Sequence, residues 1–125
     1  MNFEEMKSSE NAFIAGYGGG GFRMGDQKIE GSLLITPKGY YPWDVKTAVE
    51  ITVESLSQIL NFHHSIELLI IGTGDNMTFI SKDIRAVFAK QDIAIEAMDT
   101  GAAARTYNVL LQEGRMVSAA FIAVE

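Results

Sequence analysis

The stretch IELLIIGTGDN at residues 66–76, together with IAIEAMDTGAAARTYNVLLQEGRMVSAAFIAV at residues 93–124, decides the fold of this chain. It contains three apolar runs, at 66–71, 93–98 and 116–124, and each run is bounded by glycine or polar residues. Short apolar runs of this kind predict strands that are covered on both faces of a sheet.

Helical patterns separate these runs. We expect a helix of about ten residues to begin at Thr52 and a second helix to begin at Ser81, because both residues suit an N-cap. A third helix is expected to begin at Asp99 or Thr100 and to end at Gly114. The alternation of helix and strand predicts parallel strands joined by right-handed crossovers. The last strand is apolar at nearly every position, so we expect it inside the sheet.

Towards the N-terminus the pattern changes from helices to strands and turns. Strands are expected at 13–17, 22–24 and 28–36, with a glycine run at 18–21 and a turn at 37–39. Their connections are too short for crossovers, so these strands are predicted to be antiparallel. They either extend an edge of the main sheet or form a small second layer. The predicted fold class is α/β, with a mixed sheet, a parallel C-terminal half and extra antiparallel N-terminal strands.

Length, charge and composition exclude several classes of protein. The chain has 125 residues, the size of one domain, and the polar residues 1–10 are interpreted as a frayed tail or a short helix. A net charge of −6 disfavours nucleic acid as a partner, and no apolar run is long enough to span a membrane. The absence of cysteine excludes disulfides and thiolate chemistry. The acidic N-terminus is unlike a signal or transit peptide, so we expect a cytoplasmic location.

Two polar segments each directly follow a predicted strand, and because the strands are predicted to be parallel, the segments are expected to lie on one rim of the sheet. Open α/β sheets bind ligands beyond the carboxyl ends of their strands, so this rim is a candidate site for a small anion. The structural alternative is that the glycines permit a tight loop and that the polar residues cap a helix. The ligand-binding candidates in these segments are Gly72, Thr73, Gly74, Asp75, Asp99 and Thr100.

Three further polar residues, Arg105, Asn108 and Arg115, complete the ligand-binding candidates. Arg105 and Asn108 share a helix face, and Asn108 is interpreted as a half-buried residue that bonds a neighbouring loop. His63 and His64 have no third ligand at metal spacing, so we expect no metal and no cofactor. No triad or dyad pattern is present, so no catalytic residue is assigned and a non-enzymatic role is favoured.

Three aromatic residues form a cluster around Pro42. Tyr40, Tyr41 and Trp43 fall in a segment that we interpret as a loop. One interpretation packs them beneath the sheet, and the other makes them exposed anchors for a protein partner. They are therefore the partner-binding candidates.

The segments GYGGGGFRM, IEGSLLITPKGYYPWDV, ELLIIGTGDN, IAIEAMDTGAAARTYNVLLQEGR and VSAAFI occur together in this chain. As a combination they resemble the Mth938-like domain family, whose mitochondrial members include assembly factor three of respiratory complex I (NADH:ubiquinone oxidoreductase). The resemblance implies a three-layer α/β domain and, for the mitochondrial branch, a role in building complex I. The family motif falls on Gly72, Thr73, Gly74, Asp99, Thr100, Asn108 and Arg115.

These observations lead to two hypotheses about function. The first is a non-enzymatic assembly or interaction factor whose partners are subunits of a membrane complex or another assembly factor. It predicts a contiguous exposed apolar patch. The second is a small-molecule-binding domain or enzyme with its site at the rim, and it predicts a concave pocket with converging polar groups. A homo-oligomer is compatible with either hypothesis.

Overall fold

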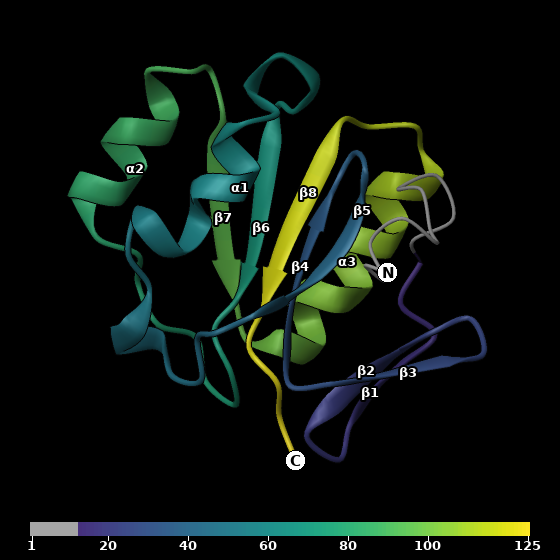
Figure 1. Ribbon diagram of the computed structural model, residues 1–125. Helices are drawn as coiled ribbons and strands as arrows, with labels where there is room; N and C mark the ends of the chain where they lie inside the picture. Colours follow the sequence, from purple (N-terminus) through teal and green to yellow (C-terminus); the bar gives the residue numbers. More distant parts are fainter. Residues whose placement is uncertain (1–12) are drawn as a thin grey trace.

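The computed structural model describes residues 13–125, so the expected tail at 1–10 lies outside the described residues. Five strands form the main sheet in the order β5-β4-β8-β6-β7 (Figure 1). Strand β6 is parallel to both β7 and β8, whereas β4 is antiparallel to both β5 and β8. The predicted mixed sheet with the last strand inside it is confirmed. The bounds are β4 Ser32–Thr36, β5 Gly39–Trp43, β6 Leu68–Gly72, β7 Ala94–Met98 and β8 Val117–Phe121.

A second, smaller sheet is formed by β1 (Gly16–Gly18), β2 (Gly21–Met24) and β3 (Gln27–Glu30), all antiparallel. The strand expected at 28–36 is therefore two strands in two sheets. The break is Gly31, whose φ of +83° lies in the left-handed region that glycine adopts without steric cost. This residue turns the chain from the small sheet into β4. The N-terminal strands therefore do both things that the sequence left open: β4 and β5 extend the main sheet, and β1, β2 and β3 form a second, smaller sheet.

Two regular helices follow the predicted caps. Helix α2 (Lys82–Ala89) begins after Ser81, whose hydroxyl accepts the Ile84 N–H, and helix α3 (Thr100–Gln112) begins after Asp99. Gly114 follows α3 with a φ of +80°, as expected for a glycine beyond a helix end. The short helices are η3 (Ala48–Glu50), η4 (Glu54–Leu56), α1 (Ser57–Leu60) and η5 (His63–Ser65).

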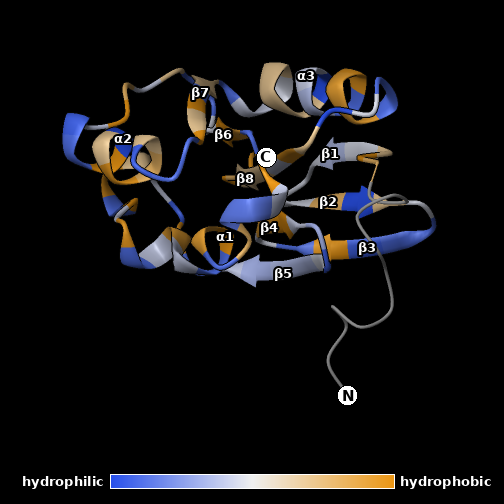
Figure 2. Cartoon of the chain, turned by 90° about the horizontal axis from the view of Figure 1, so that it is seen from above, coloured by the Kyte–Doolittle hydropathy of each residue, from blue (hydrophilic) through white to orange (hydrophobic). Residues whose placement is uncertain are grey.

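The helices and the small sheet cover the main sheet on both faces and make three layers. Figure 2 shows α3 and the small sheet on one side of the main sheet and α1 and α2 on the other. Two buried clusters fill the two interfaces, one including Ile59 and Phe88 and the other including Phe22 and Tyr107. Strand β8 contributes to both, since Ala120 belongs to the first cluster and Ala119 to the second. This burial on both faces explains why the last strand is apolar throughout.

The helix expected from Thr52 is shorter and less regular than predicted. The Thr52 and Ser55 side chains each accept the other's backbone N–H over 3.0 Å, so Thr52 does start a helical segment. That segment is the 3-10 turn η4 followed by the single-turn helix α1, rather than a continuous helix of about ten residues. Tertiary packing of Leu56 and Ile59, both fully buried, determines its course.

The prediction of a loop around Pro42 is wrong, because these residues form strand β5. It pairs with β4 from Ser32 opposite Trp43 to Thr36 opposite Gly39. Proline cannot donate to a sheet ladder, which argues against a central strand but not against an edge strand. Because β5 is the edge of the main sheet, Pro42 is tolerated there.

Candidate functional site

The carboxyl ends of β6, β7 and β8 lie at one end of the main sheet, which we call the carboxyl rim. It is formed by residues 73–81, 99–101 and 122–125, the segments that follow these three strands (Figure 1). The Thr73 N–H donates to the Met98 carbonyl over 2.8 Å, and the Ile122 N–H donates to the Gly72 carbonyl over 2.9 Å. The two polar segments therefore do meet at one rim, as predicted.

The Thr73 hydroxyl organises the loop that follows β6. It lies 2.7 Å from the Asn76 carbonyl oxygen and 3.1 Å from that of Met98, and it accepts the Thr78 N–H over 3.0 Å. Thr73 is buried, so these bonds are shielded from water. Its side chain therefore holds the loop to the neighbouring strand.

The Thr100 hydroxyl joins all three segments of the carboxyl rim. It accepts the Gly74 N–H over 3.0 Å and donates to the Ile122 carbonyl over 2.7 Å, and the Thr100 N–H donates to the Gly74 carbonyl over 2.8 Å. The side chain has no exposed surface. Thr100 thus connects the segments after β6 and β8 from the first residue of α3.

Glycine is required at position 72 by close packing. A Cβ atom at Gly72 would lie 3.0 Å from the Phe121 ring and 3.0 Å from the Thr100 side chain. Contacts this short force a neighbour to move, and both neighbours are fully buried. Gly72 therefore allows β6 and α3 to approach each other, whereas the positive φ that the structural interpretation expected at these glycines occurs at Gly74, with a value of 105°.

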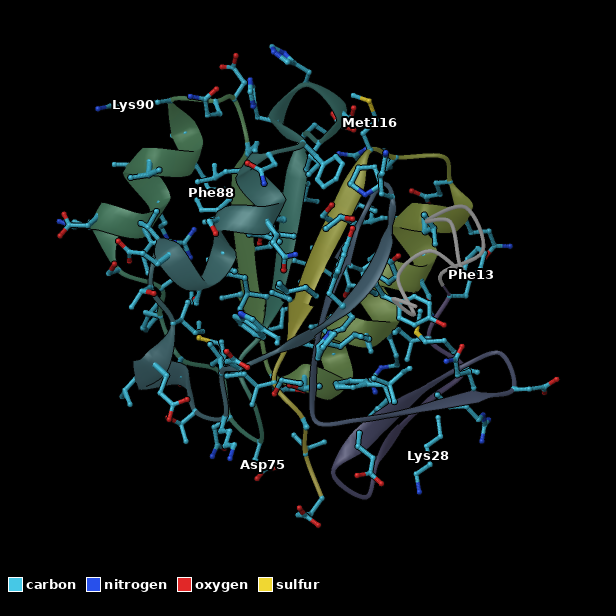
Figure 3. All side chains as sticks on the ribbon, in the orientation of Figure 1. Phe13, Lys28, Asp75, Phe88, Lys90 and Met116 are labelled. Carbon is cyan, nitrogen blue, oxygen red and sulfur yellow. The ribbon has the colours of Figure 1, made fainter. Side chains whose placement is uncertain are left out.

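The polar groups at the carboxyl rim are largely engaged within the chain. The hydroxyls of Thr73 and Thr100 and the Gly74 N–H all have internal partners, and the Asp99 carboxylate accepts the Ala102 N–H over 2.9 Å as a helix cap. These are the groups from which the expected anion site would be built. Figure 3 shows the remaining candidate, Asp75, at the tip of the rim with its side chain directed outwards.

Arg105 and Asn108 lie on α3 but bind the N-terminal segment rather than the rim loops. The Asn108 side chain accepts the Ile14 N–H over 2.8 Å and donates to the Ile14 carbonyl over 2.9 Å. Arg105 donates to the Tyr17 hydroxyl over 2.9 Å. The predicted structural role of Asn108, bonding a neighbouring backbone, is confirmed.

Arg115 lies at the opposite end of the main sheet from the carboxyl rim. It precedes β8 and forms an ion pair with Glu67, which precedes β6, over 3.0 Å. Its neighbour Met116 and the rim residue Asp75 mark opposite ends of the molecule in Figure 3. The hydrogen bond from Arg115 lowers the pKa of the Glu67 carboxyl. The structure therefore does not bring Arg115 together with the other ligand-binding candidates.

The aromatic residues of β5 are packing residues for the most part. Tyr40 is fully buried and its hydroxyl donates to Gln27 over 2.7 Å, and this burial raises the pKa of the phenol. Trp43 is buried and its Nε1 donates to the Ser55 carbonyl over 2.8 Å. Tyr41 is half-buried against the core. The geometry of Tyr40 and Trp43 agrees with the interpretation of packing beneath the sheet, not with exposed anchors.

An exposed apolar surface does occur elsewhere, at residues that sequence reasoning missed. Val49 is 90% exposed and Phe79 is 83% exposed, and both border a hollow of about 320 Å³ between η3 and the start of α2. We call this hollow the apolar groove. The sequence does carry a signal for this surface. The apolar residues of Met77-Thr78-Phe79-Ile80 follow the glycine loop and fit neither a strand pattern nor a helix pattern. The groove is lined by Ala48, Val49, Ile51, Thr78, Phe79, Ile80, Ser81 and Ile84.

A second hollow, of about 290 Å³, adjoins the apolar groove and opens on the carboxyl rim. The two hollows share Ala48 and Thr78 as lining residues. The second hollow is more polar, since Lys46, Asp75 and Asn76 line it. We call it the polar hollow. Together the two form one depression that is apolar at one end and polar at the other.

The glycine run closes the hairpin between β1 and β2. Gly19 and Gly20 have positive φ values of 63° and 84°, which the tight turn requires. The Gly20 N–H donates to the Val124 carbonyl over 2.8 Å, and the Gly31 N–H donates to the Gly20 carbonyl over 2.8 Å. The turn is therefore attached to the segment that follows β8.

Neither a metal cluster nor a helix suited to crossing a membrane occurs in the described part of the chain. Over residues 13–125 no group of three His, Asp or Glu side chains is placed to hold a metal ion. The rings of His63 and His64 lie 3.9 Å apart, and His63 Nδ1 is 3.0 Å from the Leu60 carbonyl. None of the helices in these residues is both long and apolar enough to cross a bilayer.

The sequence is similar to a family model and to a named protein. A family model described as "Protein of unknown function (DUF498/DUF598)" matches residues 14–122. A protein of Xenopus tropicalis named NADH dehydrogenase (ubiquinone) 1 alpha subcomplex assembly factor 3 is 34% identical over 118 residues. The match covers 94% of this chain and 64% of that protein, so the chain spans less than two thirds of this relative.

The fold is similar to the folds of solved structures. A crystal structure of a chain from Bartonella henselae, described as an outer membrane protein, has a TM-score of 0.89 and 39% identity, covering 95% of this chain and all of that one. A solution structure of an Mth938-like domain from Bordetella pertussis has a TM-score of 0.80 and 24% identity, covering 94% of this chain and 89% of that one. The expected Mth938-like architecture is therefore confirmed.

Proposed function

The chain belongs to the DUF498/DUF598 family, and from this membership we propose that it is a binding protein that helps to assemble a respiratory NADH dehydrogenase of the complex I type. The Xenopus tropicalis relative carries the name of such an assembly factor. Its partners would be subunits of that complex or another assembly factor. This is the interaction hypothesis, with its binding surface placed at the apolar groove instead of at the β5 aromatics.

The observation that carries the proposal is the exposure of Val49 and Phe79 beside the apolar groove. An interaction factor needs a contiguous apolar surface that water reaches in the free protein and a partner covers in the complex. Val49 and Phe79 keep 90% and 83% of their surface exposed, although Ile51 and Ile80 beside them are buried. Nothing within residues 13–125 covers these two side chains, so a partner would gain their burial.

Co-purification from cells that express the protein natively tests this proposal. The tagged protein is isolated in mild detergent, and the proteins bound to it are quantified by mass spectrometry. We expect subunits of a respiratory NADH dehydrogenase to be recovered with the wild type. Phe79→Ser should lower their recovery at least about fivefold, because interface aromatics carry a large share of binding energy.

The matched control is Val109→Ser. Val109 is also an exposed apolar residue, at 53%, but it lies on α3, which packs on the face of the sheet opposite α2. Its replacement should leave recovery unchanged. Absence of such subunits from the wild-type sample would refute the proposed function, and equal recovery with Phe79→Ser would refute the role of the groove.

A further inference from the structure

The small sheet carries a hollow of about 290 Å³ that combines basic side chains with bare backbone. Its charged lining residues are Arg23 of β2 and Lys28 of β3, and no carboxylate belongs to the lining that the described residues form. We call it the basic hollow. It shares no lining residue with the apolar groove or the polar hollow. Three glycines also line it, namely Gly16, Gly18 and Gly21.

The strand register places the two cations side by side. Arg23 pairs with Lys28 across β2 and β3, so both side chains lie on the same face of the small sheet. Their sequence neighbours Phe22 and Ile29 lie on the opposite face and are buried in the core. Arg23 and Lys28 are exposed, and Figure 3 shows Lys28 directed away from the body of the molecule. The basic hollow therefore opens on the outer face of the small sheet.

No ion pair within residues 13–125 neutralises these two cations. Asp26 and Glu30 are the carboxylates of the segment 13–31, and neither forms an ion pair with Arg23 or Lys28. Glu125 borders the turn between β1 and β2 without lining the hollow. Like charges directly opposite each other in an antiparallel pair repel. An anion bound between the two side chains would relieve this repulsion.

The missing side chain at Gly16 leaves room beside the guanidinium of Arg23. A Cβ atom at Gly16 would lie 3.5 Å from Arg23 Nη2, so the guanidinium lies over backbone that no side chain covers. Arg23 Nη2 donates to the Ala15 carbonyl over 3.3 Å. Since arginine has several further N–H donors, this bond orients the group and leaves other donors for a ligand. A guanidinium fork binds phosphate oxygens in a bidentate manner.

The charges limit the class of ligand. Two adjacent cations match a dianion, and a phosphate monoester carries a charge of about −1.5 to −2 at pH 7. The net charge of −6 of the chain repels long polyanions, which favours a small ligand. We propose that the basic hollow binds a small molecule that carries a phosphate monoester, with the phosphate between Arg23 and Lys28 and the rest of the molecule over the glycines. This inference goes beyond the proposed function and does not depend on it.

NMR titration of the full isotope-labelled chain with phenyl phosphate, in a buffer without phosphate, tests the proposal. We expect the amide signals of Gly16, Gly18 and Gly21 to shift to saturation with a Kd of about 1 mM or lower. Inorganic phosphate should shift the same signals. Benzenesulfonate has the same ring with a single negative charge and should bind at least about tenfold more weakly. Shifts spread over the whole surface, or equal affinity for both aromatic anions, would overturn the proposal.

Protein variants link this binding to the basic hollow. Arg23→Gln and Lys28→Gln should each weaken phenyl phosphate at least about tenfold, and Gly16→Val should weaken it by filling the hollow while both cations remain. Lys90→Gln is the matched control, because it makes the same charge change at an exposed lysine that Figure 3 shows far from Lys28. The amide spectrum of each variant verifies its fold. Full binding by Lys28→Gln or Gly16→Val, or equal weakening by Lys90→Gln, would overturn the hollow as the site.

A membrane lipid can present the same phosphate monoester, and a sedimentation assay separates this source from a small molecule. The chain is mixed with vesicles of phosphatidylcholine and phosphatidic acid, which are then pelleted. We expect the protein to stay in the supernatant, because two basic residues in an acidic chain attract it only weakly to an anionic surface. Pelleting that Lys28→Gln abolishes, combined with no binding of phenyl phosphate, would identify a lipid headgroup as the ligand and overturn the small-molecule proposal.

Discussion

The hydroxyl of Thr100 connects three chain segments through two hydrogen bonds in a buried environment. Its partners, the Gly74 N–H and the Ile122 carbonyl, come from the segments after β6 and β8. A buried backbone group that loses its partner costs more free energy than the bond contributes while it exists. The Thr100 side chain thus matters for stability more than its size suggests.

Thr100→Val replaces the hydroxyl by a methyl group of similar volume. We expect the free energy of unfolding to fall by about 2–4 kcal/mol, because two buried backbone groups lose a partner. Urea denaturation followed by tryptophan fluorescence of Trp43 measures the change. Thr100→Ser keeps the hydroxyl and serves as the control, and equal stability of the two variants would contradict this role.

Tyr107 differs from Thr100 in the hydrogen bonding of its buried hydroxyl. Within the described residues its hydroxyl is buried and makes no hydrogen bond, and the ring packs edge-on against Phe121 at a centroid distance of 5.8 Å. Burial raises the pKa of this phenol far above its ordinary value of 10.0. The ring stabilises the core, and the oxygen atom destabilises it.

Tyr107→Phe should raise the free energy of unfolding by about 1 kcal/mol at neutral pH, because the unpaired hydroxyl is removed. The gain should grow above about pH 10, where the unfolded state of the wild type releases the phenol proton and the folded state retains it. Urea titrations between pH 7 and pH 11 measure both effects. Tyr40→Phe is the control: it removes a hydroxyl that donates to Gln27 and should lower stability. A stability loss in Tyr107→Phe would contradict the prediction.

At the scale of secondary structure, α3 does more than cover the main sheet. Asn108 binds both backbone groups of Ile14, and Arg105 binds the Tyr17 hydroxyl. Gly101 leaves room for this contact, since a Cβ atom there would lie 2.7 Å from the Tyr17 hydroxyl. The helix therefore fixes the position of the small sheet through its polar face.

Asn108→Ala removes both bonds to Ile14. We expect the Ile14 amide to lose its protection from hydrogen exchange, and the global free energy of unfolding to fall by about 1–2 kcal/mol. Hydrogen exchange followed by NMR resolves the single amide. Gln112→Ala, an exposed position on the same helix, should leave the Ile14 amide protected. Unchanged exchange at Ile14 in Asn108→Ala would show that other contacts hold this segment.

The sequence predicted elements whose signals are local and missed those that depend on tertiary context. Ser81 and Asp99 mark helix starts because their side chains bond N–H groups three residues later. Strand β5 was missed because Pro42 argues against a strand, and only the edge position in the assembled sheet removes that objection. Asn108 was interpreted correctly because its apolar neighbours already implied a half-buried amide.

The sequence predicted where the candidate site lies, but not all of its residues or what their side chains bind. The sequence placed Thr73 and Thr100 at one rim, which the parallel strands require. It did not reveal that their hydroxyls bond the chain itself, because those partners are backbone groups distant in sequence. Phe79 was missed for a related reason, since an apolar residue in a loop is exposed or buried according to what packs over it.

At the scale of the whole molecule, the two exposed side chains proposed to bind a partner are not part of the core. The core lies in two clusters on either side of the main sheet, and the buried groove residues Ile51, Ile80 and Ile84 belong to one of them, whereas Val49 and Phe79 are exposed. A substitution of Val49 or Phe79 can therefore change binding without unfolding the chain.

Phe79→Ser should change the free energy of unfolding by less than about 0.5 kcal/mol, since the side chain is exposed. Phe88→Ala, at a fully buried phenylalanine of α2, should cost about 3–5 kcal/mol. Thermal and urea denaturation of the two variants measures the contrast. A large stability loss in Phe79→Ser would show that this side chain supports the fold, and the binding experiments would then need the Val49→Ser variant.

Strand β8 lies between β4 and β6 in the main sheet. Among the described strands it alone joins two half-sheets, one made of β4 and β5 and the other made of β6 and β7. Every other strand and helix of the described residues precedes it in the chain. During synthesis on the ribosome the two half-sheets therefore emerge first, each with an unpaired inner edge. The main sheet closes only after residues 117–121 leave the exit tunnel, so chains released before that point would expose two edges open to aggregation.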